Sequence, residues 1–165
     1  MSELKVISSD TLLFRGVQYR CAIGRSGLET GDRKEGSGTT PQGRFALREC
    51  WYRADRIRPP ATLLPMRVIK QDDGWCDEPA HPEYNRHVKL PFSASHEKLW
   101  REDHMYDIIV PMGYNDEPVV KGKGSAIFLH IAQPNYSTTE GCVAVNMQDM
   151  LTLLETLPAK PFIVI

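Results

Sequence analysis

A cysteine and a histidine stand at the two ends of one polar loop in the C-terminal part of this chain. The apolar run that begins at Phe128 leads into His130, and Cys142 follows Gly141 just before the apolar run Val143-Ala-Val145. Turn residues between them allow the loop to fold back, so we expect the thiol and the imidazole to reach hydrogen-bonding distance. A protonated imidazole lowers the pKa of a neighbouring thiol, and the thiolate is the nucleophile. The pair therefore indicates nucleophilic catalysis, and a buried cysteine beside a core histidine is the alternative interpretation.

Three neighbouring features favour the catalytic interpretation. Gly141 permits a close backbone approach beside the nucleophile. A helix predicted to begin after Asn146 would aim its N-terminal N–H groups at Cys142, which favours a thiolate and a developing oxyanion. His130 ends an apolar strand, which is a rigid support for a base.

Other kinds of site have weaker signals in this sequence. The five histidines show no His-x-x-x-His spacing and the four cysteines form no Cys-x-x-Cys pair, so we expect no metal site. The glycine-rich segment 36–43 lacks the Gly-Lys-Ser/Thr ending of a phosphate-binding loop, and no cofactor is expected. Cys21 and Cys50 lie in apolar runs and are predicted to be core residues, whereas Cys76 stays undecided.

Three segments together resemble the L,D-transpeptidase (YkuD-type) catalytic domain, in the order in which that family carries them. They are Thr40-Pro-Gln-Gly-Arg-Phe45, the strand end Leu129-His130, and Thr139-Glu-Gly-Cys142. The resemblance covers roughly residues 4–165 and implies a mainly β, sandwich-like domain with its site in a cleft. It further implies that Cys142 is the nucleophile and His130 the base. The backbone carbonyl of Ile131 would orient the imidazole, and the Gly141–Cys142 backbone would help to form the oxyanion hole.

The sequence departs from the family pattern close to the nucleophile. Glu140 replaces the histidine that usually precedes Gly-Cys, and Ala144 stands where an Arg or Asn is often found. Only twelve positions separate His130 from Cys142, fewer than in typical secreted members. Glu140 would either repel a second anionic group or bind the free amine of diaminopimelate, and the sequence leaves both interpretations open.

Further residues are candidates for substrate contact because they are aromatic, amide or basic and lie in polar segments near the predicted strand ends. A carboxypeptidase needs a cation for the terminal carboxylate of its substrate, and an arginine fork suits that group. Surface or packing roles are the alternative for each of them. The candidates, with Glu140, are Arg86, Tyr114, Asn115, Trp75, Tyr84, Asn85, Arg44 and the acidic Asp77.

The resemblance implies an enzyme that attacks the L-centre carbonyl of diaminopimelate (or lysine) in a peptidoglycan stem tetrapeptide and releases D-Ala. The short cytosolic branch of the family passes the acyl group to water, so we expect an L,D-carboxypeptidase of cell-wall recycling. The first alternative is an L,D-transpeptidase that cross-links stems or exchanges D-Ala for another D-amino acid. The second is an inactive domain that binds peptidoglycan peptides, with Glu140 and Ala144 as signs of lost activity.

Length and charge limit the other possibilities. The 165 residues are expected to form one domain, 1–165, and a net charge of −1 indicates neither a nucleic-acid-binding nor an anionic-membrane-binding protein. The N-terminus has Glu3 and only a short apolar run, unlike a secretory signal, so we expect a cytoplasmic protein. The oligomeric state is not predicted.

The supporting elements are mainly strands. Alternating or apolar runs predict strands at 4–7, 11–23 with a hairpin turn at Gly16, 44–52, 66–70, 106–112, 125–131 and 162–165. Segments 24–42 and 72–92 are predicted to be loops. Ser95 is a plausible N-cap for a short helix over 95–102. The main helix is predicted over 147–157, with Asn146 as its N-cap and Asp149 in its first turn.

Overall fold

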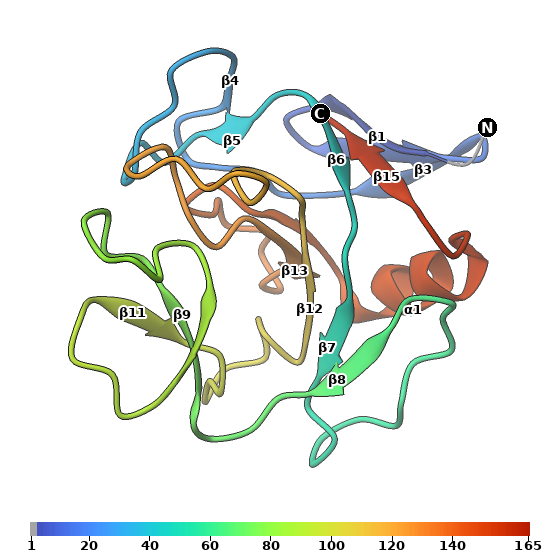
Figure 1. Ribbon diagram of the computed structural model, residues 1–165. Coiled ribbons are helices and arrows are strands. Elements are labelled where there is room, and N and C mark those ends of the chain that lie inside the picture. The colour runs from blue at the N-terminus through green and yellow to red at the C-terminus, as the bar shows by residue number, and fades with distance from the viewer. Residues whose placement is uncertain (1–2) are drawn as a thin grey trace.

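The structure is a computed structural model that describes residues 3–165. Two five-stranded sheets pack around the main apolar core (Figure 1). The first has the order β3-β2-β1-β15-β6 and comprises β1 (Leu4–Ser8), β2 (Thr11–Phe14), β3 (Val17–Arg20), β6 (Arg44–Ala46) and β15 (Phe162–Val164). The second has the order β14-β13-β12-β7-β8 and comprises β7 (Cys50–Tyr52), β8 (Met66–Val68), β12 (Ile108–Pro111), β13 (Phe128–Ile131) and β14 (Val143–Val145). The predicted mainly β class is confirmed.

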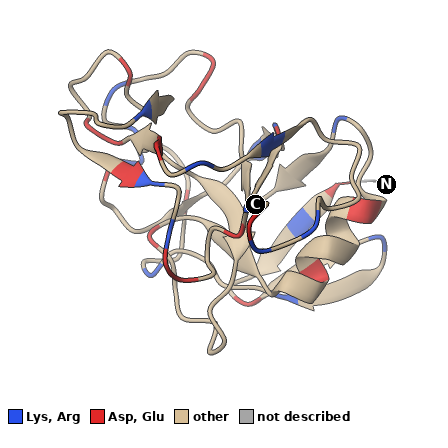
Figure 2. Ribbon diagram, turned by 90° about the horizontal axis from the view of Figure 1, so that it is seen from below, with Lys and Arg blue, Asp and Glu red and all other residues tan. Residues whose placement is uncertain are grey.

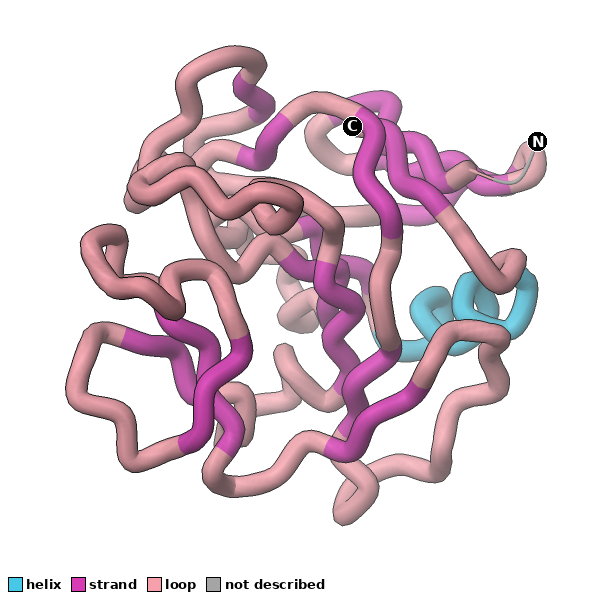
Figure 3. The backbone as a smooth tube through the Cα atoms, viewed as in Figure 1, coloured by secondary structure: helices cyan, strands magenta, loops and turns pink. Residues whose placement is uncertain are grey.

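A smaller sheet covers the other face of the second sheet. It has the order β10-β9-β11 and comprises β9 (Asp73–Cys76), β10 (His87–Lys89) and β11 (His96–Lys98). A second apolar cluster fills the space between them and includes Trp51, Phe128 and Cys142. A two-residue ladder of β4 (Leu28–Glu29) and β5 (Thr40–Pro41) ties down the segment between β3 and β6. Long loops join these short strands (Figure 3).

The alternation of side chains along β13 divides it between the two clusters. Leu129 and Ile131 point into the main core, whereas Phe128 belongs to the second cluster. His130 is two residues from Phe128 and therefore faces the same side of the sheet. β13 pairs in parallel with β14 and antiparallel with β12, so it is an interior strand and a rigid support.

The helix α1 (Met147–Thr156) follows β14 and covers the main core. Asn146 is its N-cap, because the Asn146 side chain accepts a hydrogen bond of 2.8 Å from the Asp149 N–H. The buried face consists of Met150, Leu153 and Leu154. The sequence prediction of this helix is confirmed, and its last turn ends one residue earlier.

The hairpin turn at Gly16 is also confirmed. Arg15 and Gly16 both have positive φ, at 50° and 80°, and Phe14 pairs with Val17 across the turn. A two-residue turn with positive φ at both positions matches the twist of the flanking strands, and glycine is well suited to such a position.

Two predictions between residues 72 and 102 are wrong. The expected short helix at 95–102 contains β11, because His96, Glu97 and Lys98 pair antiparallel with β9. The expected loop at 72–92 contains β9 and β10. The strands β9, β10 and β11 are only three or four residues long and carry charged and aromatic side chains. None of them therefore shows a hydrophobic period that a sequence pattern can detect.

Charged segments of both signs are scattered over the ribbon (Figure 2). Within residues 3–165, no helix has the length and hydrophobicity needed to cross a lipid bilayer.

Candidate active site

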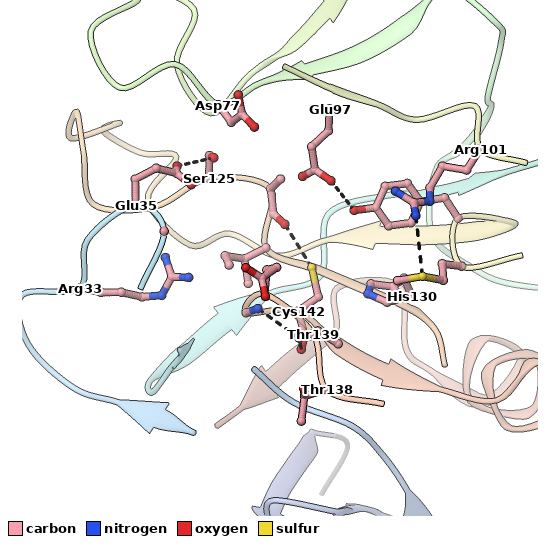
Figure 4. Close-up of a pocket in the computed structure, with 17 residues that line it drawn as sticks. Arg33, Glu35, Asp77, Glu97, Arg101, Ser125, His130, Thr138, Thr139 and Cys142 are labelled. Carbon is pink, nitrogen blue, oxygen red and sulfur yellow. Dashed lines mark hydrogen bonds between the residues drawn. The ribbon is translucent and has the colours of Figure 1, made fainter. Parts of the chain in front are cut away.

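Cys142 and His130 line one cavity of about 400 Å³ between the second sheet and the small sheet (Figure 4). β13 supplies His130, and the turn that leads into β14 supplies Gly141 and Cys142. Arg33 and Glu97 also line this cavity, from the segment between β4 and β5 and from β11. The volume is that of a site for one small ligand or one peptide end.

The imidazole of His130 is buried and held by its neighbours. Its Nδ1 atom lies 2.9 Å from the backbone carbonyl oxygen of Ile131, and its ring meets the ring of Tyr106 edge-on at 5.4 Å. Because a carbonyl only accepts hydrogen bonds, Nδ1 carries the proton and Nε2 holds the lone pair. This is the tautomer that a general base needs. Burial lowers the pKa of His130 to about 4, so the ring is neutral near pH 7.

The thiol of Cys142 is hydrogen-bonded to the backbone of the segment before and within β13. Sγ donates to the Ala126 carbonyl at 3.2 Å and accepts from the Phe128 N–H at 3.3 Å. Burial raises the pKa of Cys142 to about 12, and the negative charge of Glu97 adds to that effect. The site in this state is therefore a neutral thiol beside a neutral imidazole. Within residues 3–165 there is no hydrogen bond between Sγ and the ring, so attack requires Sγ to turn from the Ala126 carbonyl toward Nε2.

The expected contribution of the helix dipole to Cys142 is wrong. β14 lies between Cys142 and Asn146, so the N-terminus of α1 is at the far end of a strand from the thiol. A helix dipole acts only within about its first turn. The Phe128 N–H is the backbone donor that reaches Sγ, and it lowers the pKa of Cys142 against the larger effect of burial.

The turn before Cys142 depends on Thr139 and Gly141. Thr139 Oγ1 donates to the Cys142 carbonyl at 2.6 Å and accepts from the Gly141 N–H at 3.1 Å. Gly141 has φ +146°, and a Cβ there would lie 2.8 Å from the Thr39 carbonyl oxygen and 2.7 Å from Arg33 Nη2. Only glycine fits this position. The Gly141 N–H, which we predicted as an oxyanion-hole donor, is engaged by Thr139, so an oxyanion there would compete with that hydroxyl.

Arg33 is a site residue that the sequence analysis missed. It is only 4% exposed, its Nε donates to the Thr39 carbonyl at 2.8 Å, and its guanidinium lies over the Tyr114 ring at 5.6 Å. Its Nη2 atom has no hydrogen bond to any residue in 3–165 and would touch a Cβ at position 141, so it faces the cavity beside the nucleophile. The missing side chain of Gly124 leaves space for the Nη1 atom of Arg33, since a Cβ at position 124 would collide with it. No carboxylate in the described part of the chain forms an ion pair with Arg33.

Glu140 lies at the rim of the cavity and not in its interior. Its carboxylate forms an ion pair of 2.8 Å with Arg25 Nε, and its side chain is 77% exposed. The sequence left two roles open for Glu140, repulsion of an anion or binding of a substrate amine. In this structure its carboxylate is already paired with the Arg25 guanidinium of the same chain. Arg25 also donates to the Gly36 carbonyl at 3.2 Å, so the ion pair connects the nucleophile turn to the segment between β4 and β5.

Tyr84, Tyr114 and Asn115 support the wall of the site from behind. The Tyr84 hydroxyl donates to Glu35 Oε1 at 2.7 Å and accepts from the Gly124 N–H, and the residue is 1% exposed. The Tyr114 hydroxyl donates to the Lys123 carbonyl, and the Asn115 amide donates to two carbonyls of the same loop. For these three residues the structure favours packing over direct substrate contact.

Trp75, Arg86 and Arg44 are not brought to the nucleophile. Trp75 and Arg86 line a second cavity, to which Phe128 also contributes, and the Trp75 ring meets the Phe128 ring edge-on at 5.1 Å. Arg44 forms an ion pair of 2.6 Å with Glu3 and stacks on Phe162 at the first sheet. None of the three lines the Cys142 cavity in the described residues, so their role as substrate contacts of that site stays a prediction.

Asn85 is a predicted candidate for substrate contact, and its hydrogen bonds in the structure give it a supporting role. Its Oδ1 accepts from the Trp75 indole at 2.9 Å and from the Ala126 N–H at 3.0 Å, and its Nδ2 donates to the Tyr114 and Asn115 carbonyls. Ala126 has φ +54°, which is unfavourable for a residue with a Cβ. Asn85 thus helps to hold the strained residue whose carbonyl accepts the Cys142 thiol.

Within residues 3–165, no group of three or more His, Cys, Asp or Glu side chains is placed to hold a metal ion. All four cysteines are free and buried, including Cys76.

The comparisons with known proteins agree with the geometry at the level of the family. A family model described as the L,D-transpeptidase catalytic domain (YkuD) matches residues 5–165. Searches of curated proteins and of solved structures returned no match. The site has a histidine of the required tautomer on β13 and a buried cysteine in the turn before the adjacent strand β14. Since the family model also matches nearly the whole chain, this protein belongs to the L,D-transpeptidase (YkuD) catalytic domain family of cysteine-dependent enzymes that act on peptidoglycan peptides.

Proposed function

We propose that this protein is an L,D-carboxypeptidase that removes the terminal D-Ala from peptidoglycan tetrapeptides in cell-wall recycling. The observation that carries the proposal is Arg33, a buried arginine without an acidic partner in residues 3–165, which faces the cavity beside Cys142. Burying a charge without a partner costs several kcal/mol. A ligand carboxylate is the group that would offset this cost, and the free end of a tetrapeptide supplies one.

The arginine fork suits a terminal carboxylate. Thr39 and the Lys123 carbonyl hold Nε and Nη1, so the guanidinium is fixed before the ligand arrives. A preorganised donor binds a carboxylate with less loss of side-chain entropy. A substrate whose D-Ala carboxylate binds at Arg33 would have its scissile bond one residue away, beside the Cys142 thiol.

The size of the cavity is consistent with water as the proposed acceptor. At the rim of the cavity the Arg25–Glu140 ion pair and the Arg25–Gly36 hydrogen bond connect the nucleophile turn to the segment between β4 and β5. A cavity of about 400 Å³ takes one peptide end, and a second stem peptide would need additional room. Transpeptidation through the same acyl-enzyme is the alternative, because the family match covers both reactions.

The proposed reaction uses one base twice. Cys142 Sγ passes its proton to His130 Nε2 and attacks the carbonyl carbon of the third residue of the stem. The tetrahedral intermediate collapses, the C–N bond to D-Ala breaks, and His130 returns the proton to the leaving amine. Water then attacks the thioester and gives a proton to His130, and the thiol is released with that proton while the tripeptide acid departs.

We extend the proposal to the compartment. Free stem peptides with an intact D-Ala carboxylate are recycling intermediates, so we propose that the protein acts in the cytoplasm. Fractionation of cells that produce the tagged protein tests this part independently. Recovery of the protein outside the cytoplasmic fraction would contradict it.

The activity is tested with one incubation read by mass spectrometry. The protein is mixed with a sugar-free stem tetrapeptide, with and without D-Met in excess. We expect D-Ala release and tripeptide as the main product in both mixtures, and Cys142→Ala should reduce the rate by at least about 10³-fold. Cys76→Ala is the matched control, since Cys76 is also a buried free thiol and does not line the cavity.

Each other outcome selects an alternative. A D-Met adduct as the main product would identify an exchange or transpeptidase activity. Binding of the tetrapeptide without turnover would identify an inactive binding domain. Full activity of Cys142→Ala would overturn the assignment of the nucleophile.

A further inference from the structure

The nucleophile is held by two backbone groups of one short segment. Cys142 Sγ donates to the Ala126 carbonyl at 3.2 Å and accepts from the Phe128 N–H at 3.3 Å (Figure 4). The contacts are buried, since Cys142 is only 8% exposed and Ala126 and Phe128 belong with it to the second apolar cluster. The path of the backbone through residues 126–128 therefore fixes where Sγ lies in the cavity that it shares with His130.

Ala126 has a backbone conformation that its own side chain disfavours. Its φ of +54° lies in the left-handed region, where the Cβ of an ordinary residue comes too close to the backbone. A conformation of this kind persists only when the surrounding groups hold it. The carbonyl that accepts the Cys142 thiol therefore depends on whatever holds residue 126.

The side chain that holds Ala126 is the amide of Asn85. Its Oδ1 accepts the Ala126 N–H at 3.0 Å and the Trp75 indole N–H at 2.9 Å. Its Nδ2 donates to the backbone carbonyls of Tyr114, at 3.2 Å, and Asn115, at 2.8 Å. Both lone pairs and both N–H groups of this amide are used, and the residue is 7% exposed. The amide therefore has one satisfied orientation, which gives the Ala126 N–H a fixed acceptor.

We infer that Asn85 is a positioning residue for the nucleophile: it holds Ala126 in the left-handed conformation, and Ala126 in turn fixes Cys142 Sγ for attack. The inference rests on the proposed function, in which Cys142 is the nucleophile and the stem tetrapeptide is the substrate. Without the Asn85 amide, residue 126 would relax to a favourable φ, its carbonyl would turn away, and Sγ would lose one of its two contacts. A small displacement of a reacting atom lowers the rate of attack more than it weakens the binding of substrate.

The first variant is Asn85→Gly, which removes the amide without straining its own backbone, because Asn85 has φ +56° and glycine tolerates this value. It changes no charge in the cavity. We expect kcat for D-Ala release to fall by about 5- to 30-fold, as the strain of a left-handed residue with a Cβ implies, and KM to change less than about 2-fold. Asn146→Gly is the matched control, because it also removes an amide that accepts a backbone N–H, at the start of α1 and away from the cavity. The control should keep wild-type kinetics.

A second variant, Ala126→Gly, separates positioning from a general structural role. Glycine adopts a φ of +54° at little cost, so residue 126 would no longer depend on the Asn85 amide. We expect Asn85→Gly to lower kcat less than about 2-fold when it is introduced into the Ala126→Gly protein. A role of Asn85 that does not act through residue 126 would give the same fall in both backgrounds.

Alkylation of Cys142 by iodoacetamide reports on the thiol without any substrate. A hydrogen bond to the neutral form of a group disfavours its charged form, so loss of the Ala126 acceptor favours the reactive thiolate. We expect Cys142 to be alkylated at least about 3-fold faster in Asn85→Gly than in the wild-type protein, and nearly at the wild-type rate in Asn146→Gly. Cys50, a buried free thiol of the main core, is the internal reference, and its rate should not change. Peptide mass spectrometry measures both cysteines.

Three results would overturn the inference without affecting the proposed function. They are an unchanged kcat in folded Asn85→Gly, an equal fall in kcat in both backgrounds, and an equal rise in the alkylation of Cys142 and Cys50. If Asn85→Gly alone does not fold, the double variant decides. A kcat within about 2-fold of that of Ala126→Gly supports the inference, and a larger fall or an unfolded double variant contradicts it. Absence of D-Ala release by the wild-type protein would instead contradict the proposed function, and the alkylation rates would still test the position of the thiol.

Discussion

At the scale of single residues, the site is poised in its neutral form. The pKa of Cys142 is raised to about 12 and that of His130 is lowered to about 4, both chiefly by burial. A resting thiolate–imidazolium pair would need the opposite shifts. Proton transfer to Nε2 therefore accompanies attack, and the hydrogen bond from Nδ1 to the Ile131 carbonyl stabilises the imidazolium that forms.

Arg33 gives the first prediction at this scale. Arg33→Lys keeps the charge and loses the planar fork, so we expect kcat/KM for D-Ala release to fall by about 10- to 100-fold, mainly through KM. A peptide that ends in a D-Ala amide lacks the carboxylate and should be cleaved equally slowly by both proteins. Arg44→Lys, at the first sheet, is the control and should retain wild-type kinetics. Equal sensitivity of acid and amide substrates to Arg33→Lys would show that Arg33 acts only structurally.

At the scale of elements, glycines decide how closely the segments around the nucleophile approach one another. The turn before β14 lies against the Thr39 carbonyl, and the loop at Gly124 lies against Arg33. Both glycines have positive φ and would place a Cβ within another group. The parallel pairing of β13 with β14 then places His130 and Cys142 on one face of the sheet.

Gly141→Ala gives the prediction at this scale. Its Cβ would meet the Thr39 carbonyl and Arg33 Nη2, and φ +146° is unfavourable for alanine, so we expect a loss of about 3 kcal/mol or more in the free energy of unfolding. D-Ala release should fall at least about 100-fold. Gly122→Ala is the control: it has φ +85° and open space at its Cβ, so it should cost only about 1 kcal/mol and keep activity. Urea unfolding and D-Ala release measure the two effects. Similar losses in both variants would show that the close contact at Gly141 has no special role.

At the scale of the whole molecule, two apolar clusters share the second sheet. The main core joins the two large sheets and α1, and the second cluster joins the second sheet to the small sheet. The His130 side chain lies on the face of the second sheet that the small sheet covers, and it is only 2% exposed. Protonation of this buried ring opposes folding, so the site and the global stability are coupled.

The pH dependence of stability is the corresponding prediction. The pKa of His130 is about 4 in the folded state and about 6.5 when unfolded, so between these values the unfolded state binds more protons. The neutral His130 ring makes its full contribution to the free energy of unfolding above pH 6.5. This contribution is lost as pH falls toward 4, by up to about 3 kcal/mol.

The contribution of His130 to stability is the difference in the free energy of unfolding between the wild-type protein and a His130 variant. Urea unfolding of the wild-type protein and of His130→Gln is compared at pH 7 and pH 4.5, and the difference between the two proteins should shrink or reverse at the lower pH. His104→Gln is the control, since the His104 side chain is 78% exposed. An equal pH response of wild type and His130→Gln would contradict the assigned shift in the pKa.

The sequence by itself determined the features that depend on neighbours along the chain. These are the Cys142–His130 loop with its preceding glycine, the turn at Gly16 and the N-cap at Asn146. Each rests on a local rule: turn chemistry, side-chain alternation or capping. Together with the family motifs they were sufficient for the mainly β fold and for the choice of the reactive pair.

Only the tertiary structure decided which charged residues surround that pair. Arg33 and Glu97 come from segments that are far from Cys142 in sequence; the segment between β4 and β5 brings Arg33 to the cavity, and the short strand β11 brings Glu97. Arg44 and Arg86 have the same chemistry and lie elsewhere. The choice among these arginines depends on strand pairing and on space left by Gly124 and Gly141, which are non-local packing effects that a residue type does not encode.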